Sequence, residues 1–361
     1  MNKHIRHVAL ATVSLLSMST LVSCGFRYSP RILSVGKAFH QFNRSQQAEQ
    51  FNQADQEGNT DYEHHRYDLA VQQYTRMIAI SPHSSIGYLL RGNAYSQENH
   101  FALSITDYSM SMKYERDHAL LADLYFNRGN SYEQMGKTAQ AVSNFTEAIR
   151  LNPLILDAHE ARMMAYFTSH RYAQALPDCN VLIARHPQEA RTWGMRGKIE
   201  SAEGDTMHAA KDFEHALALD STYLPAYNGL EEQDERARDY AAMLLVCQRQ
   251  VAANPSNPYS WGDLGWAQYK VGRLKDAIAT DQKSLSLSGT QGAGAAAVAH
   301  FNLGLCYAVQ GNADRAEAEY KTGLASATPE ERQDSLDEAR KASQGQPQSV
   351  ALKRVVYLLA P

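Results

Sequence analysis

The stretch LYFNRGNSYEQMGKTAQAVSNFTEAIRLNP, residues 124–153, decides the fold of this chain. It contains two segments with apolar residues at helical spacing, which are separated by Gly136 and followed by Pro153. Glycine readily adopts the left-handed conformation that ends a helix, and proline cannot continue a helix. The stretch therefore predicts two helices joined by a tight turn.

The same pattern recurs along the chain with a period of 34 residues. When Ala122 is position 1 of a window, position 8 from the second window onward reads Gly92, Gly129, Met163, Gly197, Glu231, Gly265 and Gly304. Most of these residues are small enough to let two helices approach closely. We count eight windows: 51–84, 85–118, 122–155, 156–189, 190–223, 224–257, 258–291 and 297–330. Residues 119–121 and 292–296 are extra residues between windows.

Position 15 of each window gives an independent check, because the chain is expected to turn there. It reads His65, Asn99, Gly136, His170, Gly204, Arg238, Gly272 and Gly311. Glycine and asparagine are the residues that most readily follow a helix in the left-handed conformation. Their recurrence at one position supports the alignment.

These windows resemble the tetratricopeptide repeat (TPR), whose signature is matched by Tyr125, Gly129, Tyr132, Ala141 and Phe145. The resemblance implies an all-α superhelical solenoid of about eight helix–turn–helix repeats over residues 51–330. Residues 331–361 read as two further helices that cap the last repeat, which would otherwise expose an apolar face. The phrases RGNAY (91–95) and RGNSY (128–132) are then parts of helix packing and not catalytic motifs.

The first residues have a different character. Residues 1–23 begin with Lys3 and Arg6 and continue with an uncharged apolar run too short for an ordinary membrane span. The run ends in Leu-Val-Ser-Cys at 21–24, which resembles the lipobox of bacterial lipoproteins. The resemblance implies cleavage before Cys24, acylation of Cys24, and sorting to the outer membrane because Gly25 follows. The alternative is a cleaved secretory signal with an incidental cysteine.

Residues 24–50 follow as a lipid-anchored tether with an excess of basic residues. The tether is either a spacer or a segment that rests on an anionic lipid or cell-wall surface.

Composition and motifs exclude several classes of function. The net charge is −4, so no broad basic surface argues for nucleic acid binding. The sequence contains no HExxH, no CxxC and no glycine-rich phosphate loop, so no catalytic residue, metal or cofactor is expected. Cys179, Cys247 and Cys306 are expected to be buried free thiols, and His159 to lie at the surface or cap a helix.

In the family that the repeats resemble, the first helix of each repeat lines the concave binding surface with positions 2, 5, 9, 12 and 13. Carrying those positions over gives candidate partner-binding residues Leu89, Asn93, Phe126, Asn130, Glu133, Met164, Phe167 and Trp266. Two of them, Asn93 and Asn130, share position 9, and an asparagine can both donate to and accept from a peptide backbone.

Relatives that bind acidic chain termini have lysine at position 5, where this chain has Leu89 and Phe126. A ligand of mixed apolar and polar character is therefore expected. The alternatives are that these side chains face the next repeat, that the C-terminal tail fills the groove, and that Trp266 only packs.

The sequence thus predicts a non-catalytic scaffold that binds other envelope proteins, anchored through lipid on Cys24 and facing the periplasm. An assembly factor for an outer-membrane machine, such as a pilus or secretion system, is the alternative. An enzyme would need a reactive cleft, and no residues in the sequence suggest one. The partner, the pathway and the oligomeric state stay open.

Overall fold

The structure is a computed structural model that describes residues 46–289 and 293–360. Cys24, the predicted signal and the predicted tether up to residue 45 lie outside these residues. The described residues form 18 α-helices and no strand, so the all-α prediction is confirmed. They divide at residues 187 and 188 into two compact units, and each unit is described by itself.

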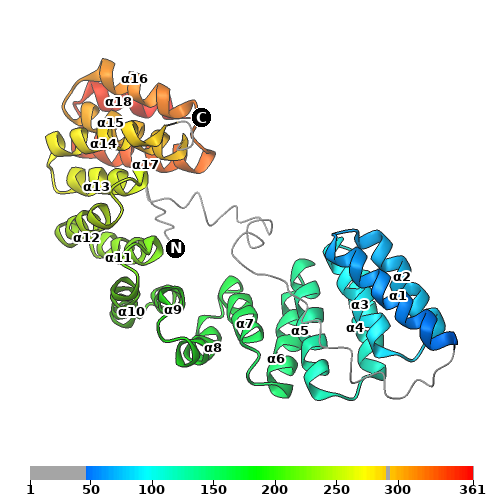
Figure 1. Cartoon of the computed structure of the whole chain (residues 1–361). Helices are drawn as coiled ribbons and strands as arrows, with labels where there is room; N and C mark the ends of the chain where they lie inside the picture. The colour runs from blue at the N-terminus through cyan, green and yellow to red at the C-terminus, as the bar shows by residue number, and fades with distance from the viewer. Residues whose placement is uncertain (1–45, 290–292, 361) are drawn as a thin grey trace. The chain divides into compact units, whose positions relative to one another are not determined.

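The first unit contains four helix pairs, and in each pair the two helices lie side by side, as Figure 1 shows for α5 and α6. Its helices are α1 (Gln46–Glu63), α2 (Tyr67–Ile80), α3 (Ser85–Gln97), α4 (Phe101–Tyr114), α5 (His118–Gln134), α6 (Thr138–Leu151), α7 (Leu156–Thr168) and α8 (Tyr172–Arg185).

The second unit continues with four more pairs and ends in two additional helices. Its helices are α9 (Ala190–Glu203), α10 (Thr206–Leu219), α11 (Leu224–Ala237), α12 (Tyr240–Ala253), α13 (Pro258–Lys270), α14 (Leu274–Ser288), α15 (Ala293–Val309), α16 (Ala313–Leu324), α17 (Pro329–Gly345) and α18 (Val350–Leu359).

The described extra residues between repeats, 119–121 and 293–296, are helical. Residues 119–121 belong to the first turn of α5, and residues 293–296 form the first turn of α15. Both sets of residues lengthen the start of a first helix.

All eight residues at position 15 have positive φ angles, between 58° and 100°. The pattern expected from the glycines and Asn99 therefore extends to His65, His170 and Arg238. A non-glycine residue in this conformation is strained by about 1–2 kcal/mol. In the two HRY tripeptides the histidine Nδ1 lies 2.7 Å from the tyrosine hydroxyl two residues later, a hydrogen bond that offsets part of this strain.

The small residue at position 8 makes room for an aromatic ring at position 24 of the second helix. A Cβ atom at Gly129 would lie 2.6 Å from Phe145 Cε1, and one at Gly92 would lie 2.9 Å from Tyr108 Cε1. The predicted close approach of the two helices is confirmed. Fully buried aromatic rings at this position form the centre of most repeats.

The arginine of the RGN phrase joins neighbouring helices. Arg91 donates to both carboxylate oxygens of Asp107 at 2.7 and 2.8 Å, and to the hydroxyl of Thr75 in the preceding repeat at 3.1 Å. Arg162 repeats the arrangement with Asp178 and with the preceding repeat. This bidentate geometry occupies the guanidinium group, which therefore serves structure.

The tail caps the last repeat in the structure. A capping box between Thr328 and Glu331 starts α17, and both tail helices contact α15. The buried side chains of Leu336 and Leu352 join the apolar cluster around Phe301. None of the helices in the described part of the chain is long and apolar enough to cross a membrane.

Candidate functional site

The candidate site is the outward surface of α3, α5 and α7, the first helices of repeats two to four. Helix α5 contacts both α3 and α7, so these helices form one continuous surface. We call it the A face and define it by positions 2, 5, 9, 12 and 13 of each helix. Its residues are Ile86, Leu89, Asn93, Ser96, Gln97, Asp123, Phe126, Asn130, Glu133, Gln134, Asp157, Glu160, Met164, Phe167 and Thr168.

Five of the predicted residues lie partly exposed on this face: Phe126, Asn130, Glu133, Met164 and Phe167. The Phe126 ring packs 6.0 Å from the ring of Phe145, and the Phe167 ring packs 5.8 Å from the ring of Tyr172. Both rings are packed against a neighbouring ring and are partly exposed. Aromatic rings and methionine side chains beside polar groups are common in protein-binding surfaces.

Glu133 is the most unusual of these side chains. Its carboxyl has no hydrogen-bond or ion-pair partner among the described residues, and burial raises its pKa to about 7. The charged form is therefore poorly solvated and uncompensated. A group that donates a hydrogen bond or carries positive charge would be stabilised beside it.

Asn93 and Leu89 do not lie where they were predicted. Asn93 is only 3% exposed, and its Oδ1 atom accepts from the Tyr108 hydroxyl at 2.9 Å and from Asn127 Nδ2 at 3.4 Å. Leu89 is also buried, in a cluster with Tyr108 and Leu124. Both side chains hold repeats together, so the prediction that they are accessible was wrong.

A hydroxyl at position 24 helps to hold Asn93 inside the second repeat. Tyr108 draws Asn93 inward, and Tyr74 bonds the corresponding Asn59 of the first repeat at 2.9 Å. The third repeat has Phe145 at this position, and a phenylalanine ring cannot donate a hydrogen bond. Asn130 therefore lacks this bond and stays partly exposed. Asn59 also stays partly exposed despite its bond to Tyr74, so a tyrosine at position 24 does not by itself decide whether the asparagine is buried.

Trp266 is also removed from the accessible surface, because only 2% of it is exposed. Its Nε1 donates to Glu235 Oε1 at 3.4 Å, and the Lys270 ammonium lies 4.7 Å from its ring centre. That ammonium also lies 3.6 Å from Glu338 of α17. The tail thus covers this region, and the alternative interpretation of Trp266 as a packing residue is correct.

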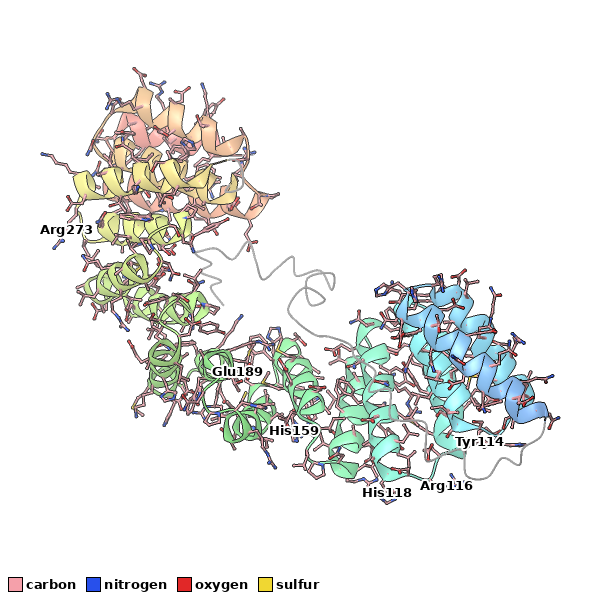
Figure 2. The ribbon with its side chains drawn as sticks, viewed as in Figure 1. Tyr114, Arg116, His118, His159, Glu189 and Arg273 are labelled. Carbon is pink, nitrogen blue, oxygen red and sulfur yellow. The ribbon has the colours of Figure 1, made fainter. Side chains whose placement is uncertain are left out.

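His159 was expected at the surface or at a helix end, and the structure places it inside. It projects from α7 (Figure 2), is 5% exposed, and its Nδ1 lies 2.6 Å from Asp178 Oδ1. Burial raises the pKa of Asp178, but hydrogen bonds from His159 and Arg162 outweigh it and hold the pKa below its usual value. The pair ties α7 to α8.

The described residues also bear on whether the chain could bind a metal or use a reactive cysteine. No group of three or more His, Cys, Asp or Glu side chains in the described residues could hold a metal ion. Cys179, Cys247 and Cys306 are buried and form no disulfide, as predicted. Burial raises the pKa of the Cys247 and Cys306 thiols, which therefore remain protonated and poorly nucleophilic.

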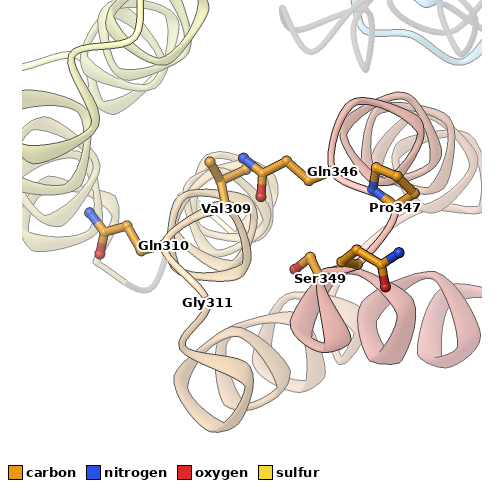
Figure 3. A pocket seen from close by; sticks show the side chains of 7 residues that line it. Val309, Gln310, Gly311, Gln346, Pro347 and Ser349 are labelled. Carbon is orange, nitrogen blue, oxygen red and sulfur yellow. The ribbon is translucent and has the colours of Figure 1, made fainter.

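A hollow of about 440 Å³ lies in the second unit, between the α15–α16 turn and the α17–α18 turn (Figure 3). None of the residues that line it is charged or titratable near neutral pH, so it offers no acid–base group. They are Val309, Gln310, Gly311, Gln346, Pro347, Gln348 and Ser349.

Comparison with known proteins agrees with the repeat pattern. Residues 122–153 match the family model of the tetratricopeptide repeat. The chain is 25% identical over 176 residues to rat RNA polymerase II-associated protein 3, which covers 45% of this chain and 27% of that protein. It is 30% identical over 122 residues to the wheat Hsp70-Hsp90 organizing protein, which covers 34% of this chain and 20% of that protein. The chain therefore spans about a quarter of the length of these relatives or less.

Two solved structures share the fold at low identity. The C-terminal part of a TPR repeat-containing protein from Cytophaga hutchinsonii matches with a TM-score of 0.51 and 13% identity, covering 79% of this chain and 98% of that one. A tetratricopeptide repeat protein from Parabacteroides merdae matches with a TM-score of 0.50 and 16% identity, covering 76% and 98%. The family match at residues 122–153, the paired helices and the two solved structures together show that the chain has the fold of a tetratricopeptide repeat solenoid.

Proposed function

We propose that the protein is a non-catalytic scaffold that binds segments of partner proteins on the A face and is held at a bacterial membrane by lipid on Cys24. The observation that carries the binding role is the set of partly exposed apolar groups, Phe126, Met164 and Phe167, beside the amide of Asn130 and the unpartnered carboxyl of Glu133. One relative supports it by name, as an organizing protein for Hsp70 and Hsp90.

The anchor is proposed from the sequence of residues 1–24. An apolar run that ends in Leu-Val-Ser-Cys supports cleavage before Cys24 and acylation of its thiol. A single acyl chain binds a membrane only marginally, whereas two or more chains hold firmly. We place the protein at the outer membrane, facing the periplasm, with other envelope proteins as its partners.

Anchoring gives the scaffold its mechanism. A lipid on Cys24 confines the A face to a thin layer next to the membrane. A partner bound there gains effective concentration for other components of the same layer. The same mechanism would serve an adaptor for soluble enzymes or an assembly factor for a pilus or secretion system.

The binding role is tested by crosslinking and pull-down of the protein from its own envelope. We expect the Asn130→Arg/Met164→Ala variant to recover at least about tenfold less of the partner than the native chain. Leu103→Ala/Leu154→Ala is the matched control, because both leucines are exposed outside the A face. Circular dichroism checks that each variant is folded. Equal recovery by the face variant and the control would contradict the proposal.

The anchor is tested by metabolic labelling with an alkyne fatty acid. The native chain should take up the label and remain with the membrane fraction. Cys24→Ser should lose the label and move to the soluble periplasmic fraction, whereas Cys306→Ser should keep it, because Cys306 is buried. Labelling that survives Cys24→Ser would refute the proposed site.

A further inference from the structure

The A-face positions of the first unit carry acids and no base. Including α1, positions 2, 5, 9, 12 and 13 of the first four repeats make twenty residues, and none is Lys, Arg or His. With 35 Lys and Arg among 361 residues, composition alone would place about two there. Six of the twenty are acidic: Asp55, Glu63, Asp123, Glu133, Asp157 and Glu160.

The arginines of α3 and α7 are engaged by other carboxylates, whereas Arg128 of α5 donates to the neutral side chains of Asn144 and Ser109. Arg91 and Arg162 stand at position 7, on another side of the helix, and their guanidinium groups pair with Asp107 and Asp178 of the second helices. Glu133 has no partner among the described residues. The negative charge of the A face is therefore not balanced by the arginines of α3 and α7.

The absence of basic residues from these positions is confined to the first unit. In repeats five and six the same positions include Arg191, Lys198 and Arg236 as well as Glu232 and Glu235. In repeat seven the face is covered by α17, whose Glu338 pairs with Lys270. A requirement of the repeat fold itself would act on every repeat. The acids on α1, α5 and α7 therefore point to what this surface binds.

We propose that the A face binds a basic, apolar segment of another protein, whose lysine or arginine side chains pair with Glu133 and Asp157. This inference rests on the proposed scaffold function and specifies its partner. Apolar side chains of the segment contact Phe126, Met164 and Phe167, which lie among the acids on α5 and α7. Charge complementarity of this kind speeds association and rejects acidic segments.

Binding of defined peptides to the full chain tests the charge requirement. The probe is a blocked, fluorescent peptide of about nine residues that alternates lysine and leucine, and the matched peptide alternates glutamate and leucine. We expect the lysine peptide to bind at least about tenfold more tightly in fluorescence anisotropy. Its affinity should fall as the salt concentration rises, because surface ion pairs are screened.

Two charge-matched variants locate the binding. Glu133→Gln/Asp157→Asn removes two acids from the A face and should weaken the lysine peptide about tenfold. Asp68→Asn/Glu147→Gln removes two acids from the second helices α2 and α6 and should leave its affinity within about twofold. Asp68 and Asp157 both lie in the first turn of a helix, so the two variants perturb helix ends alike.

The other outcomes separate this inference from the proposed function. If both peptides bind equally and Asn130→Arg abolishes both, the basic partner is refuted while the binding face stands. If both variants weaken the lysine peptide alike, binding is unspecific and the inference fails. If the peptide binds only after Arg27, Arg31, Lys37 and Arg44 are changed to Gln, the basic N-terminal segment of the chain itself occupies the face, and the external partner is refuted.

Discussion

Two cysteines explain two irregular residues. Position 8 is usually glycine, but the fourth repeat has Met163 and the sixth has Glu231. In both repeats position 24 is a cysteine in place of a large ring, and Cys179 Sγ lies 3.1 Å from Met163 Sδ. A large residue at position 8 is thus matched by a small residue at position 24. The volume between the two helices is kept, which is what a close-packed core requires.

Making position 24 large and position 8 small in the fourth repeat tests whether the two side chains share one volume. Cys179→Phe alone should lower the free energy of unfolding by about 1–3 kcal/mol, because the ring would overlap Met163. Adding Met163→Gly recreates the pairing of Gly129 with Phe145 and should restore most of the loss. Urea unfolding of both single variants and the double variant measures the coupling. Additive losses would show that the two positions do not share one volume.

Asp281 is another departure from the repeat pattern, because a carboxyl group occupies position 24 of the seventh repeat, where most repeats have an aromatic ring. It is fully buried, and Asn302 Nδ2 donates to its Oδ1 at 3.2 Å. Its Oδ2 has no partner among the described residues. Burial and the nearby carboxyl of Asp263 raise its pKa well above the usual value despite the hydrogen bond from Asn302. The folded protein therefore holds this group protonated.

The raised pKa predicts a pH dependence of stability. The unfolded chain ionises Asp281 above about pH 4, whereas the folded chain retains the proton, so stability falls as the pH rises from there. Asp281→Asn removes this loss and should stabilise the protein on the order of 1–3 kcal/mol at pH 7. The gain should shrink toward pH 4, and thermal unfolding from pH 4 to 8 measures it. A gain that does not change with pH would contradict the protonated state.

At the scale of elements, the tail helices replace the next repeat. Helix α18 contacts both α15 and α16, as a ninth repeat would if the array continued. Its Leu352 and Val355 are fully buried, while Tyr357 on its opposite side is 87% exposed. A repeat array needs such a terminal element, because each repeat buries its apolar face only against a neighbour.

The two faces of α18 should respond differently to truncation. Leu352→Ala should lower the free energy of unfolding by about 2–5 kcal/mol, since it leaves a cavity against α15 and α16. Tyr357→Ala on the same helix should change it by less than about 0.5 kcal/mol. Chemical denaturation of both variants provides the comparison. Similar losses in the two variants would contradict the one-sided packing of α18.

At the scale of the whole molecule, most of the fold is predictable from the sequence because every repeat has similar residues at the positions where its helices pack and turn. The glycines and Asn99 at position 15 predicted the turns, and all eight residues there have positive φ. His65, His170 and Arg238 adopt it too, because the helices on either side fix the backbone. Local propensity is overridden where packing decides.

The binding surface was less predictable, because helix position alone does not decide exposure. Asn93 and Asn130 share position 9, yet only Asn93 meets a tyrosine hydroxyl and is buried. Trp266 shares that position too, and there the tail decides, through contacts that no repeat pattern contains. Where a side chain is covered by an element outside the repeat pattern, its position in the repeat does not predict whether it is exposed.

The central claim is that the A face of the first unit is where partner proteins bind. Site-specific photo-crosslinking in the native envelope tests it most directly, with a photoreactive amino acid placed either at Asn130 or at Leu103. Asn130 lies on the A face, and Leu103, 49% exposed, lies on the second helix α4. We predict a discrete crosslinked partner from Asn130 and none from Leu103. The same partner from both sites, or a partner from Leu103 alone, would contradict the claim.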